Sequence, residues 1–306
     1  MADLRPELFA GDVLAAAEAL AGPAPGLESI RAMGERARRV LFLGMGSSRY
    51  AALDAAALLR GHGIDAAAEI ASTGSPQPPS ADTLVFAISA TGGSEETVAA
   101  MRRHLGTSMV AGVTSVPASA IGAEADACLE IASDGPSGVA CASYRSTVAV
   151  LREAACGLLV PAAAPPAGWR ERAAGAIAEL LDGRGQWLPR MLEQLGGGPV
   201  HVLAPAERLG AAEQSALMLR EVPRVPADAC ETGDWSHVDV YLTKRPGYRA
   251  LLLPGSAYEA EMWEWQAQRG FTVVTADVPG EADVRPLVET LVAELLAAEL
   301  WAADPI

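Results

Sequence analysis

The chain has 306 residues, of which 50% are apolar and 20% charged, a composition typical of a globular protein large enough for two domains. The formal net charge of −15 argues against a nucleic-acid partner, because phosphate backbones are bound by concentrated lysine and arginine. The apolar runs are interrupted by charges and the first residues lack a signal-peptide pattern, so we expect a cytoplasmic protein that is not associated with a membrane.

Short apolar runs alternate with helical patterns, which predicts parallel sheets covered by helices. In the first half, strands are expected at residues 39–44, 64–70, 83–89 and 108–114, with helices beginning near Ser48, Ser94 and Ser143. In the second half, strands are expected at residues 199–204, 222–228, 250–254 and 272–276, followed by a packing helix at 283–302. The predicted fold class is α/β, with two tandem domains that are each a doubly wound, flavodoxin-like parallel sheet flanked by helices.

A proline-rich stretch at residues 161–168 and the glycine run at 196–198 bracket a long helical pattern. These signals predict an N-terminal helical arm at 1–26, a first domain at 27–166, a connecting helix at 167–198 and a second domain at 199–306. The cysteines form no Cys-x-x-Cys pair and have no histidine at zinc spacing, so we expect reduced thiols, no metal centre and no cofactor.

The first predicted strand ends in a glycine-rich turn, loop 1 (residues 44–48), which reads GMGSS and leads into a helix. Such a turn lets the backbone approach a ligand and directs free helix N–H groups toward an anion. Dinucleotide-binding domains have similar glycines, and Glu69 in the next strand could serve there as a ribose ligand. Against this alternative, Arg49 stands in place of the third glycine, and Ser47 and Ser48 supply hydroxyls that a dinucleotide site does not need.

A second turn, loop 2 (residues 89–94), follows the third predicted strand and carries the hydroxyls of Ser89, Thr91 and Ser94. These groups could converge on one phosphate, together with helix N–H groups. The alternative is structural, with Ser94 capping its helix and the other two hydroxyls forming turns. We favour a ligand site because open α/β sheets bind ligands beyond the carboxyl ends of their strands.

Loop 2 and the start of its helix read SATGGSEET, which resembles the phosphate loop of sugar isomerase (SIS) domains, usually SxSGxTxDT. Loop 1 is similar to the first ligand loop of that family, and GVACAS at residues 138–143, here loop 3, is similar to its GVASTK. The resemblance spans roughly residues 27–278 and implies two tandem SIS domains, as in the isomerase part of glucosamine-6-phosphate synthase and related phosphosugar isomerases and deaminases. It implies substrate- and phosphate-binding roles for Gly46, Ser47, Ser48, Ser89, Thr91, Ser94, Val139 and Cys141.

The second half contains ALMLRE followed by GDWSH, which is similar to the family segments ALKLKE and GELKHGP. Glu221 and His237 fall on the acid–base positions. The resemblance implies that Glu221 transfers a proton between C1 and C2 of the sugar, and that His237 of a neighbouring subunit helps to open the ring. Aldose–ketose exchange does require a group that takes and returns a carbon-bound proton and another with a pKa near neutrality. The alternative for Glu221 is an exposed helix-end carboxylate paired with Arg220 or Arg224.

The other histidines are expected in structural roles: His62 at a helix end, His104 on an exposed helix face, and His201 as a hydrogen-bonded core residue of a strand. The imine-forming lysine of synthase-type relatives has no counterpart, because Lys244 is the only lysine and Met218 replaces the lysine of ALKLKE. We therefore do not expect imine chemistry.

The sequence thus predicts a phosphosugar aldose–ketose isomerase, or an aminosugar-phosphate isomerase or deaminase, that works through an enediol. The expected partner is a small-molecule sugar phosphate, and the resemblance implies a homodimer with the site at the subunit interface. The alternatives are a non-catalytic sugar-phosphate-binding regulator, a sugar–amine deglycase and, more distantly, a dinucleotide-dependent dehydrogenase.

Overall fold

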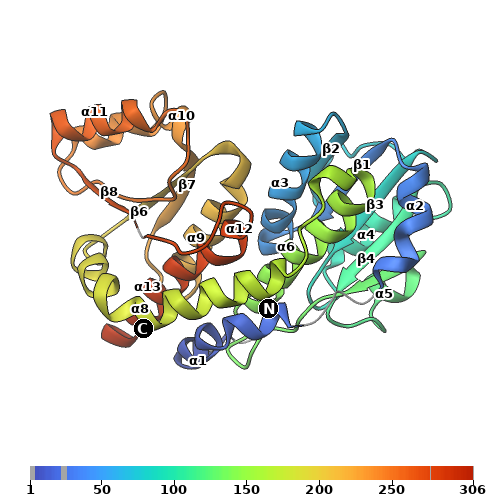
Figure 1. Cartoon of the computed structure of the whole chain (residues 1–306), viewed down its shortest axis with the longest axis horizontal. Coiled ribbons are helices and arrows are strands. Elements are labelled where there is room, and N and C mark those ends of the chain that lie inside the picture. The colour runs from blue at the N-terminus through green and yellow to red at the C-terminus, as the bar shows by residue number, and fades with distance from the viewer. Residues whose placement is uncertain (1–3, 22–25, 276, 306) are drawn as a thin grey trace. The chain divides into compact units, whose positions relative to one another are not determined.

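The apolar runs of the sequence form two parallel sheets in the computed structural model, which describes residues 4–21, 26–275 and 277–305 (Figure 1). The described chain divides into two compact units. One, the first-sheet unit, comprises Ala19–Ser133 and Ala142–Glu171. The other, the second-sheet unit, comprises the described residues of Met1–Glu18, Asp134–Cys141 and Arg172–Ile306. The short segment Asp134–Cys141 therefore packs with the second-sheet unit although both of its flanking stretches belong to the first.

The first sheet has five parallel strands, and β3 and β4 are buried along their whole length, as expected where helices cover both faces. In spatial order the strands are β2 (Asp65–Ile70), β1 (Arg39–Gly44), β3 (Thr83–Ile88), β4 (Met109–Thr114) and β5 (Ala127–Glu130). The helices of this unit are α2 (Arg31–Arg36), α3 (Gly46–Gly61), α4 (Glu95–His104), α5 (Ala120–Glu124), α6 (Ala142–Leu151) and α7 (Gly157–Leu159). Short 3-10 turns lie at Leu27–Ile30 and Pro161–Ala163, and a π-helical turn at Arg152–Cys156 joins α6 to α7.

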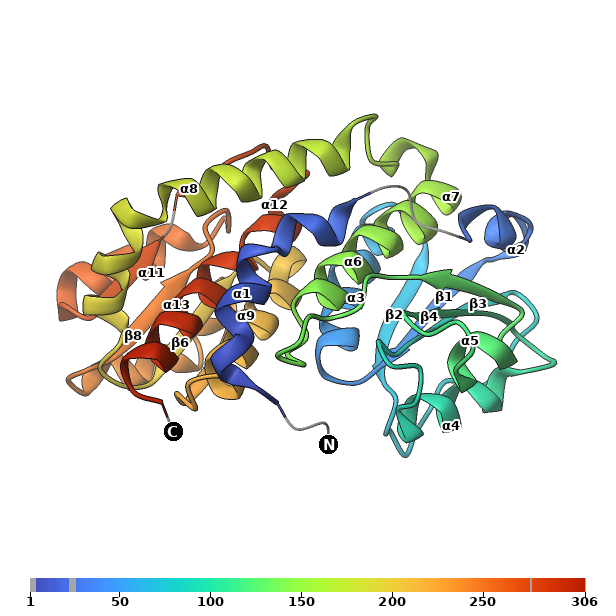
Figure 2. The same ribbon diagram turned by 90° about the horizontal axis from the view of Figure 1, so that it is seen from below.

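Alternate residues of the central strands build two separate apolar cores. Val40 and Phe42 of β1 belong to the core shared with α3, where the rings of Phe42 and Phe86 stack with centroids 5.2 Å apart. Leu41 belongs to the other core, together with Met101 of α4. Figure 2 shows α3 and α6 on one side of this sheet and α4 and α5 on the other. The two covered faces explain why these strands are apolar throughout rather than alternating.

The second sheet has four parallel strands. In spatial order they are β7 (Ala227–Glu231), β6 (Val200–Ala204), β8 (Arg249–Leu252) and β9 (Thr272–Thr275). Its unit contains the helices α1 (Phe9–Leu14), α9 (Leu209–Glu221), α10 (Thr232–Trp235), α11 (Glu259–Arg269), α12 (Arg285–Val288) and α13 (Thr290–Ala303), and most of α8 (Trp169–Leu195). Further 3-10 segments are Pro6–Leu8, Ala206–Arg208 and Asp239–Lys244, and another, Ala16–Leu20, crosses from this unit into the first-sheet unit. Helix α9 packs against β6 and β7, and α13 packs against α9.

Two parallel sheets flanked by helices are the architecture that the sequence predicts, and all but one of the predicted strands lie within two residues of their expected ends. The exception is the strand expected at 222–228, which is found at Ala227–Glu231 because Pro223 and Pro226 supply no N–H for a ladder. Strand β5 was not predicted. The expected helix at 283–302 is divided into α12 and α13. Ala276, residues 1–3 and 22–25 of the expected arm, and Ile306 lie outside the described residues, and the proposed domain boundaries stay a prediction.

Candidate functional site

The strand order of the first sheet brings loops 1 and 2 to one place. The chain passes from β1 through α3 to β2 on one side and later returns to β3 on the other side of β1, so the order reverses between β1 and β3. Loop 1 leaves the carboxyl end of β1 and loop 2 leaves that of β3. A reversal of this kind opens a crevice that is the usual ligand position of doubly wound sheets.

Loop 1 is tightly folded at its start and open afterwards. A Cβ at Gly44 would lie 3.1 Å from the Cβ of Ser48, so a side chain there would press on the first turn of α3. Gly46 is exposed and has a φ of +47°. The hydroxyls of Ser47 and Ser48 are half-buried and have no hydrogen-bond partner among the described residues. Loop 1 therefore presents two uncommitted hydroxyls at a helix N-terminus.

Loop 2 is held by a closed turn around Gly92. The Gly92 N–H donates to the carbonyl oxygen of Ser89 at 2.9 Å, and the residue has a φ of +66°. A Cβ at Gly92 would overlap the hydroxyl of Ser119, so only glycine fits. Thr91 is exposed, and in the described part of the chain neither its hydroxyl nor the backbone N–H of Thr91 or Gly93 has a partner. The turn thus directs donors outward.

The two other hydroxyls of loop 2 are already engaged. Ser94 caps α4, because its Oγ accepts the N–H of Thr97 at 3.4 Å and donates to Oε2 of Glu96 at 3.0 Å. Ser89 is 5% exposed, and its Oγ accepts the N–H of Ser94 at 3.4 Å. The capping role of Ser94 is thus observed, while ligand binding by Ser89 and Ser94 stays a prediction.

Two charged groups near the carboxyl ends of β1 and β2 have buried atoms that lack partners among the described residues. Arg49 follows loop 1 in the first turn of α3, and its Nε is buried without a hydrogen-bond partner. Glu69 lies at the carboxyl end of β2 and pairs in register with Leu43 of β1. Its Oε2 accepts the N–H of Gln77 at 3.1 Å, whereas its Oε1 is buried and unpartnered. Such atoms are rare in native structures, and each requires an explanation.

Loop 3 is built into the second-sheet unit up to Cys141. The N–H of Ser137 donates to Oδ2 of Asp12 at 2.9 Å, and Nε2 of Gln214 on α9 donates to the carbonyl oxygen of Ala140 at 2.7 Å. The side chains of Val139 and Cys141 are fully buried. Their N–H groups donate to Ser137 Oγ and Asp134 Oδ1, both at 3.1 Å. Binding roles for Val139 and Cys141 stay a prediction, and their side chains face the protein interior here.

Glu221 is the last residue of α9, and its Oε2 is buried with no hydrogen-bond partner among the described residues. Burial raises the pKa of this carboxyl; the charge of Arg224 opposes the shift, and that of Asp134 adds to it. Neither neighbouring arginine forms an ion pair with the carboxylate: Arg224 donates to the backbone oxygen of Glu221, and Arg220 to that of Ala227 at 2.9 Å. Glu221 is therefore not the solvated, paired carboxylate of the structural alternative.

His237 is exposed and follows α10, where its N–H donates to the carbonyl oxygen of Asp234 at 2.8 Å. Strand β7 lies between the two candidate acid–base groups in the chain, since Glu221 precedes it and His237 follows it. The five residues of this strand span about 16 Å. His237 is also not among the groups that shift the pKa of Glu221. Within one chain the structure does not bring these two residues together.

Two of the remaining predictions are corrected. His104 is 1% exposed rather than on an exposed face, and its Nδ1 lies 3.1 Å from Ser108 Oγ. His201 stacks on Tyr248 with ring centroids 4.4 Å apart, but its Nδ1 is buried without a hydrogen-bond partner among the described residues, so it is not fully satisfied. Trp235 is fully buried and donates from Nε1 to the Tyr248 hydroxyl at 2.8 Å, which makes it a core residue.

The order of the second sheet also reverses, between β6 and β8, but carboxylates of the chain itself occupy this edge. Arg208, just after β6, pairs with Glu289 and donates to the carbonyl oxygen of Pro254 after β8. The N–H of Ser256 donates to Oε1 of Glu259 at 2.9 Å. The donors that would hold a ligand anion here are already satisfied, so the first sheet is the better candidate for binding one.

Two residues near Glu221 were not predicted. Gln214 and Asp134 both position loop 3, and the charge of Asp134 also raises the pKa of Glu221. A helical signal existed for Gln214, because it lies seven residues before Glu221 and so falls on the same face of α9. No sequence pattern pointed to Asp134, because Glu221, the group whose pKa it affects, lies far away in the sequence at the end of α9.

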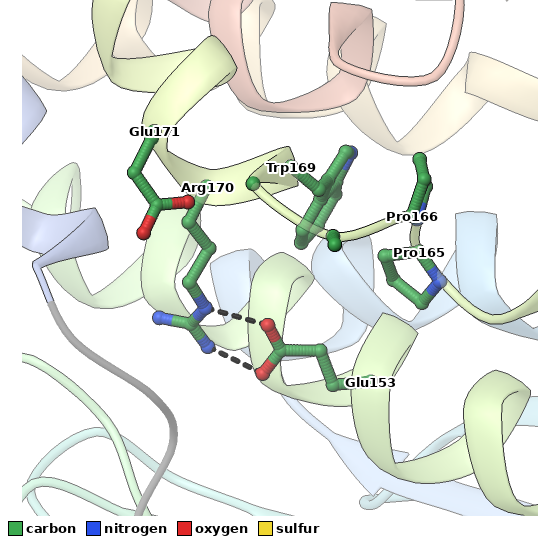
Figure 3. Close-up of a pocket in the computed structure, with 8 residues that line it drawn as sticks. Glu153, Pro165, Pro166, Trp169, Arg170 and Glu171 are labelled. Carbon is green, nitrogen blue, oxygen red and sulfur yellow. Dashed lines mark hydrogen bonds and ion pairs between the residues drawn. The ribbon is translucent and has the colours of Figure 1, made fainter.

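A pocket of about 300 Å³ lies in the first-sheet unit at the start of α8 (Figure 3). It is lined by Glu153, Pro165, Pro166, Ala167, Gly168, Trp169, Arg170 and Glu171. As Figure 3 shows, Arg170 and Glu153 form a two-pronged ion pair, with Nε–Oε1 at 2.6 Å and Nη2–Oε2 at 2.7 Å. Because the two charges satisfy each other, we assign this pair a structural role.

Within the described residues, no three His, Cys, Asp or Glu side chains gather as a metal site would require. The search of the same residues for helices found none both long and apolar enough to cross a membrane.

Residues 35–156 match the family model of the SIS domain, a span that contains loops 1 and 2 and most of the first-sheet unit. Comparison with curated proteins finds no match. Among solved structures, the chain is similar to glucosamine-6-phosphate deaminase from Thermotoga maritima, with 18% identity, a TM-score of 0.77, and 97% of this chain and 95% of that chain covered.

Two further solved structures are similar over nearly the whole chain. The C-terminal domain of glucosamine-fructose-6-phosphate aminotransferase from Francisella tularensis has 17% identity and a TM-score of 0.75, covering 97% of this chain and 94% of that one. Tagatose-6-phosphate ketose/aldose isomerase from Escherichia coli has 15% identity and a TM-score of 0.71, covering 98% of this chain and 92% of that one. At these identities the likeness establishes the fold of both units.

Proposed function

We propose that the chain binds a sugar phosphate through loops 1 and 2 and catalyses aldose–ketose isomerisation, or isomerisation with loss of an amino group. The observation that carries the proposal is the reversal of strand order between β1 and β3, which brings the two hydroxyl-bearing loops to the carboxyl ends of neighbouring strands. The uncommitted hydroxyls of Ser47, Ser48 and Thr91 support it, as does the SIS match across both loops. We propose further that the second-sheet unit is a second SIS domain.

The phosphate would be held by neutral donors, namely serine and threonine hydroxyls and backbone N–H groups at the start of α3 and beside Gly93. Such donors bind an anion without a lysine, which fits a chain with one lysine and a net charge of −15. The guanidinium of the half-buried Arg49, in the first turn of α3, would add a charged donor.

Glu221 is our candidate for the proton transfer. A carboxyl whose pKa is raised by burial holds and releases a proton more evenly near neutral pH than a solvated one. Its carboxylate would take the proton from C2 of an open-chain aldose while the C1 oxygen gains a proton, which gives an enediol. It would then return the proton to C1 while the C2 hydroxyl loses its proton, which gives the ketose. His237, which is exposed, would assist ring opening from a second copy of the chain in a homodimer.

A non-catalytic sugar-phosphate-binding regulator is the second candidate. The lack of an imine-forming lysine supports it, because Lys244 is the only lysine and Met218 stands where the related segment ALKLKE has one. A deglycase would use the same C1/C2 proton transfer on a sugar–amine adduct.

Binding is tested by thermal stabilisation with glucose 6-phosphate, fructose 6-phosphate, tagatose 6-phosphate, glucosamine 6-phosphate and NAD(P). The double variant Ser47→Ala/Thr91→Ala should bind the preferred sugar phosphate about tenfold or more weakly, since two charge-assisted hydrogen bonds are lost. The matched control is Thr107→Ala, an exposed threonine just before β4 at the opposite edge of the sheet. Stabilisation by NAD(P) alone, or equal binding by both variants, would contradict the proposal.

A further inference from the structure

Gln214 is a fully buried polar side chain of α9 that none of the proposed roles uses. Its Nε2 donates to the carbonyl oxygen of Ala140 in loop 3 at 2.7 Å, and lies 3.7 Å from Sδ of Met218, one turn further along the helix. Its Oε1 is buried and has no hydrogen-bond partner among the described residues. The side chain therefore makes one short hydrogen bond, and that bond goes to loop 3.

Packing alone does not explain a glutamine at this position. Most of the buried residues of α9 are apolar, among them Ala211, Met218 and Leu219. A buried amide whose oxygen has no donor is destabilising, whereas a methionine of similar length would fill the same space without that cost. What the glutamine supplies and a methionine does not is an N–H donor for the carbonyl of Ala140. The role of Gln214 therefore lies in where it holds loop 3.

Loop 3 connects Gln214 to the surroundings of Glu221. The residue after Ala140 is Cys141, whose N–H donates to Oδ1 of Asp134 at 3.1 Å. Burial is the main cause of the raised pKa of the Glu221 carboxyl, and the negative charge of Asp134 adds to it. Gln214 and Glu221 are seven residues apart, so they share one face of α9. Loop 3 is thus held at one point by Gln214 and at the next by Asp134, whose charge reaches Glu221.

We propose that Gln214 is a positioning residue for Glu221: by fixing the carbonyl of Ala140, it keeps Asp134 in place relative to the carboxyl that would transfer the proton. This inference rests on the role proposed above for Glu221. Gln214 is fully buried, so it acts only through loop 3. If loop 3 moves, Asp134 moves with it, and the repulsion that disfavours an ionised Glu221 becomes weaker, while the opposing charge of Arg224 remains. The hydrogen bond of Gln214 therefore helps to set the pH at which Glu221 can accept a proton.

An NMR titration of the Glu221 carboxyl tests the proposal without any substrate. The chain is labelled with carbon-13 glutamate, and the signal of Glu221 is the one that disappears in Glu221→Gln. Gln214→Met keeps the length and helix preference of the side chain but removes the donor. We expect Glu221 to titrate at a lower pH in Gln214→Met than in the parent chain, because the like charge of Asp134 is no longer held in place. An unchanged titration in a variant that circular dichroism finds folded would overturn the proposal.

Asp134→Asn is the second variant, and it carries the test if Gln214→Met does not fold. The asparagine keeps an oxygen for the N–H of Cys141 but has no charge. Glu221 should therefore titrate at a lower pH in this variant too. Equal titration in Asp134→Asn and the parent chain would refute the proposal, because there would be no charge for Gln214 to hold in place.

Gln266→Met on α11 is the matched control. It removes a hydrogen bond of the same kind, from Nε2 of Gln266 to the carbonyl oxygen of Phe271 at 3.2 Å, and should leave the titration of Glu221 unchanged. An equal shift in this control would show that the bond of Gln214 is not the cause, and would contradict the proposal.

The pH profile of C2 proton exchange separates this inference from the proposed function. In Gln214→Met the low-pH limb of the exchange rate should move to lower pH together with the NMR titration, because the base must be ionised. The KM for the sugar phosphate should stay within about twofold, since loops 1 and 2 would bind the phosphate. A shifted titration of Glu221 without exchange by the parent chain would support the positioning role and contradict the proposed function alone.

Discussion

Replacing Gly92 by alanine should distort loop 2 and destabilise the first-sheet unit. Gly92 has a φ of +66°, a conformation that costs an L-residue roughly 1–2 kcal/mol. The added Cβ would also overlap the Ser119 hydroxyl and lie 2.9 Å from Oγ1 of Thr114, and displacing such neighbours costs typically about 1–3 kcal/mol. Together these terms predict a loss of about 2–5 kcal/mol in the free energy of unfolding, accompanied by weaker sugar-phosphate binding.

Gly93→Ala is the matched control, because it changes the adjacent residue of the same loop by the same methyl group. Gly93 does not have a positive φ, and its added Cβ would meet only Oγ1 of Thr91, at 4.0 Å. Urea unfolding of both variants, followed by circular dichroism, should find Gly93→Ala within about 1 kcal/mol of the parent chain. If Gly92→Ala is as stable as Gly93→Ala, the described conformation of loop 2 is wrong.

Two further predictions concern buried charges. Burial raises the pKa of Glu289 from 4.5 to about 7, so between these pH values the native state keeps a proton that the unfolded chain releases. The free energy of unfolding should therefore fall by up to about 3 kcal/mol as the pH rises through this interval. Glu289→Gln should remove this pH dependence in unfolding curves taken at several pH values. Glu153→Gln should cost about 3 kcal/mol in the same assay, because Arg170 would lose its partner in a largely buried pair. Glu28→Gln, in the exposed pair with Arg31, should have a much smaller effect, and equal effects would mean that burial does not set the strength of these pairs.

The sequence predicts most strands of this fold because their apolar runs are bounded by glycine, proline and polar residues. It fails where a local pattern conflicts with backbone chemistry or is too short. The apolar residues after Glu221 suggest a strand, but Pro223 and Pro226 delay it, and Arg224 adopts a φ of +58° that no strand contains. Strand β5 is a four-residue edge strand, so its pattern has too few residues to register.

The candidate site, like the fold, could be predicted where the local sequence carries a clear pattern and not where distant segments meet. Loops 1 and 2 stand out because glycines and hydroxyls directly follow buried strands. His104 was misplaced through its arginine neighbours, although the helical period puts it on the same face as Met101 and Thr97, which are both buried. The surroundings of Glu221 could not be predicted, because Asp134 reaches it from another part of the chain.

Proton exchange at C2 of the sugar phosphate is the most direct test of the proposed function. The preferred hexose or hexosamine 6-phosphate is incubated with the protein in heavy water, and loss of the C2 proton signal is followed by NMR. We expect exchange by the parent chain and unchanged exchange by Glu264→Gln, which replaces an exposed glutamate on α11. Exchange by Glu221→Gln should be slower by about a hundredfold or more. Tight binding without exchange on any sugar phosphate, or full exchange by Glu221→Gln, would contradict it.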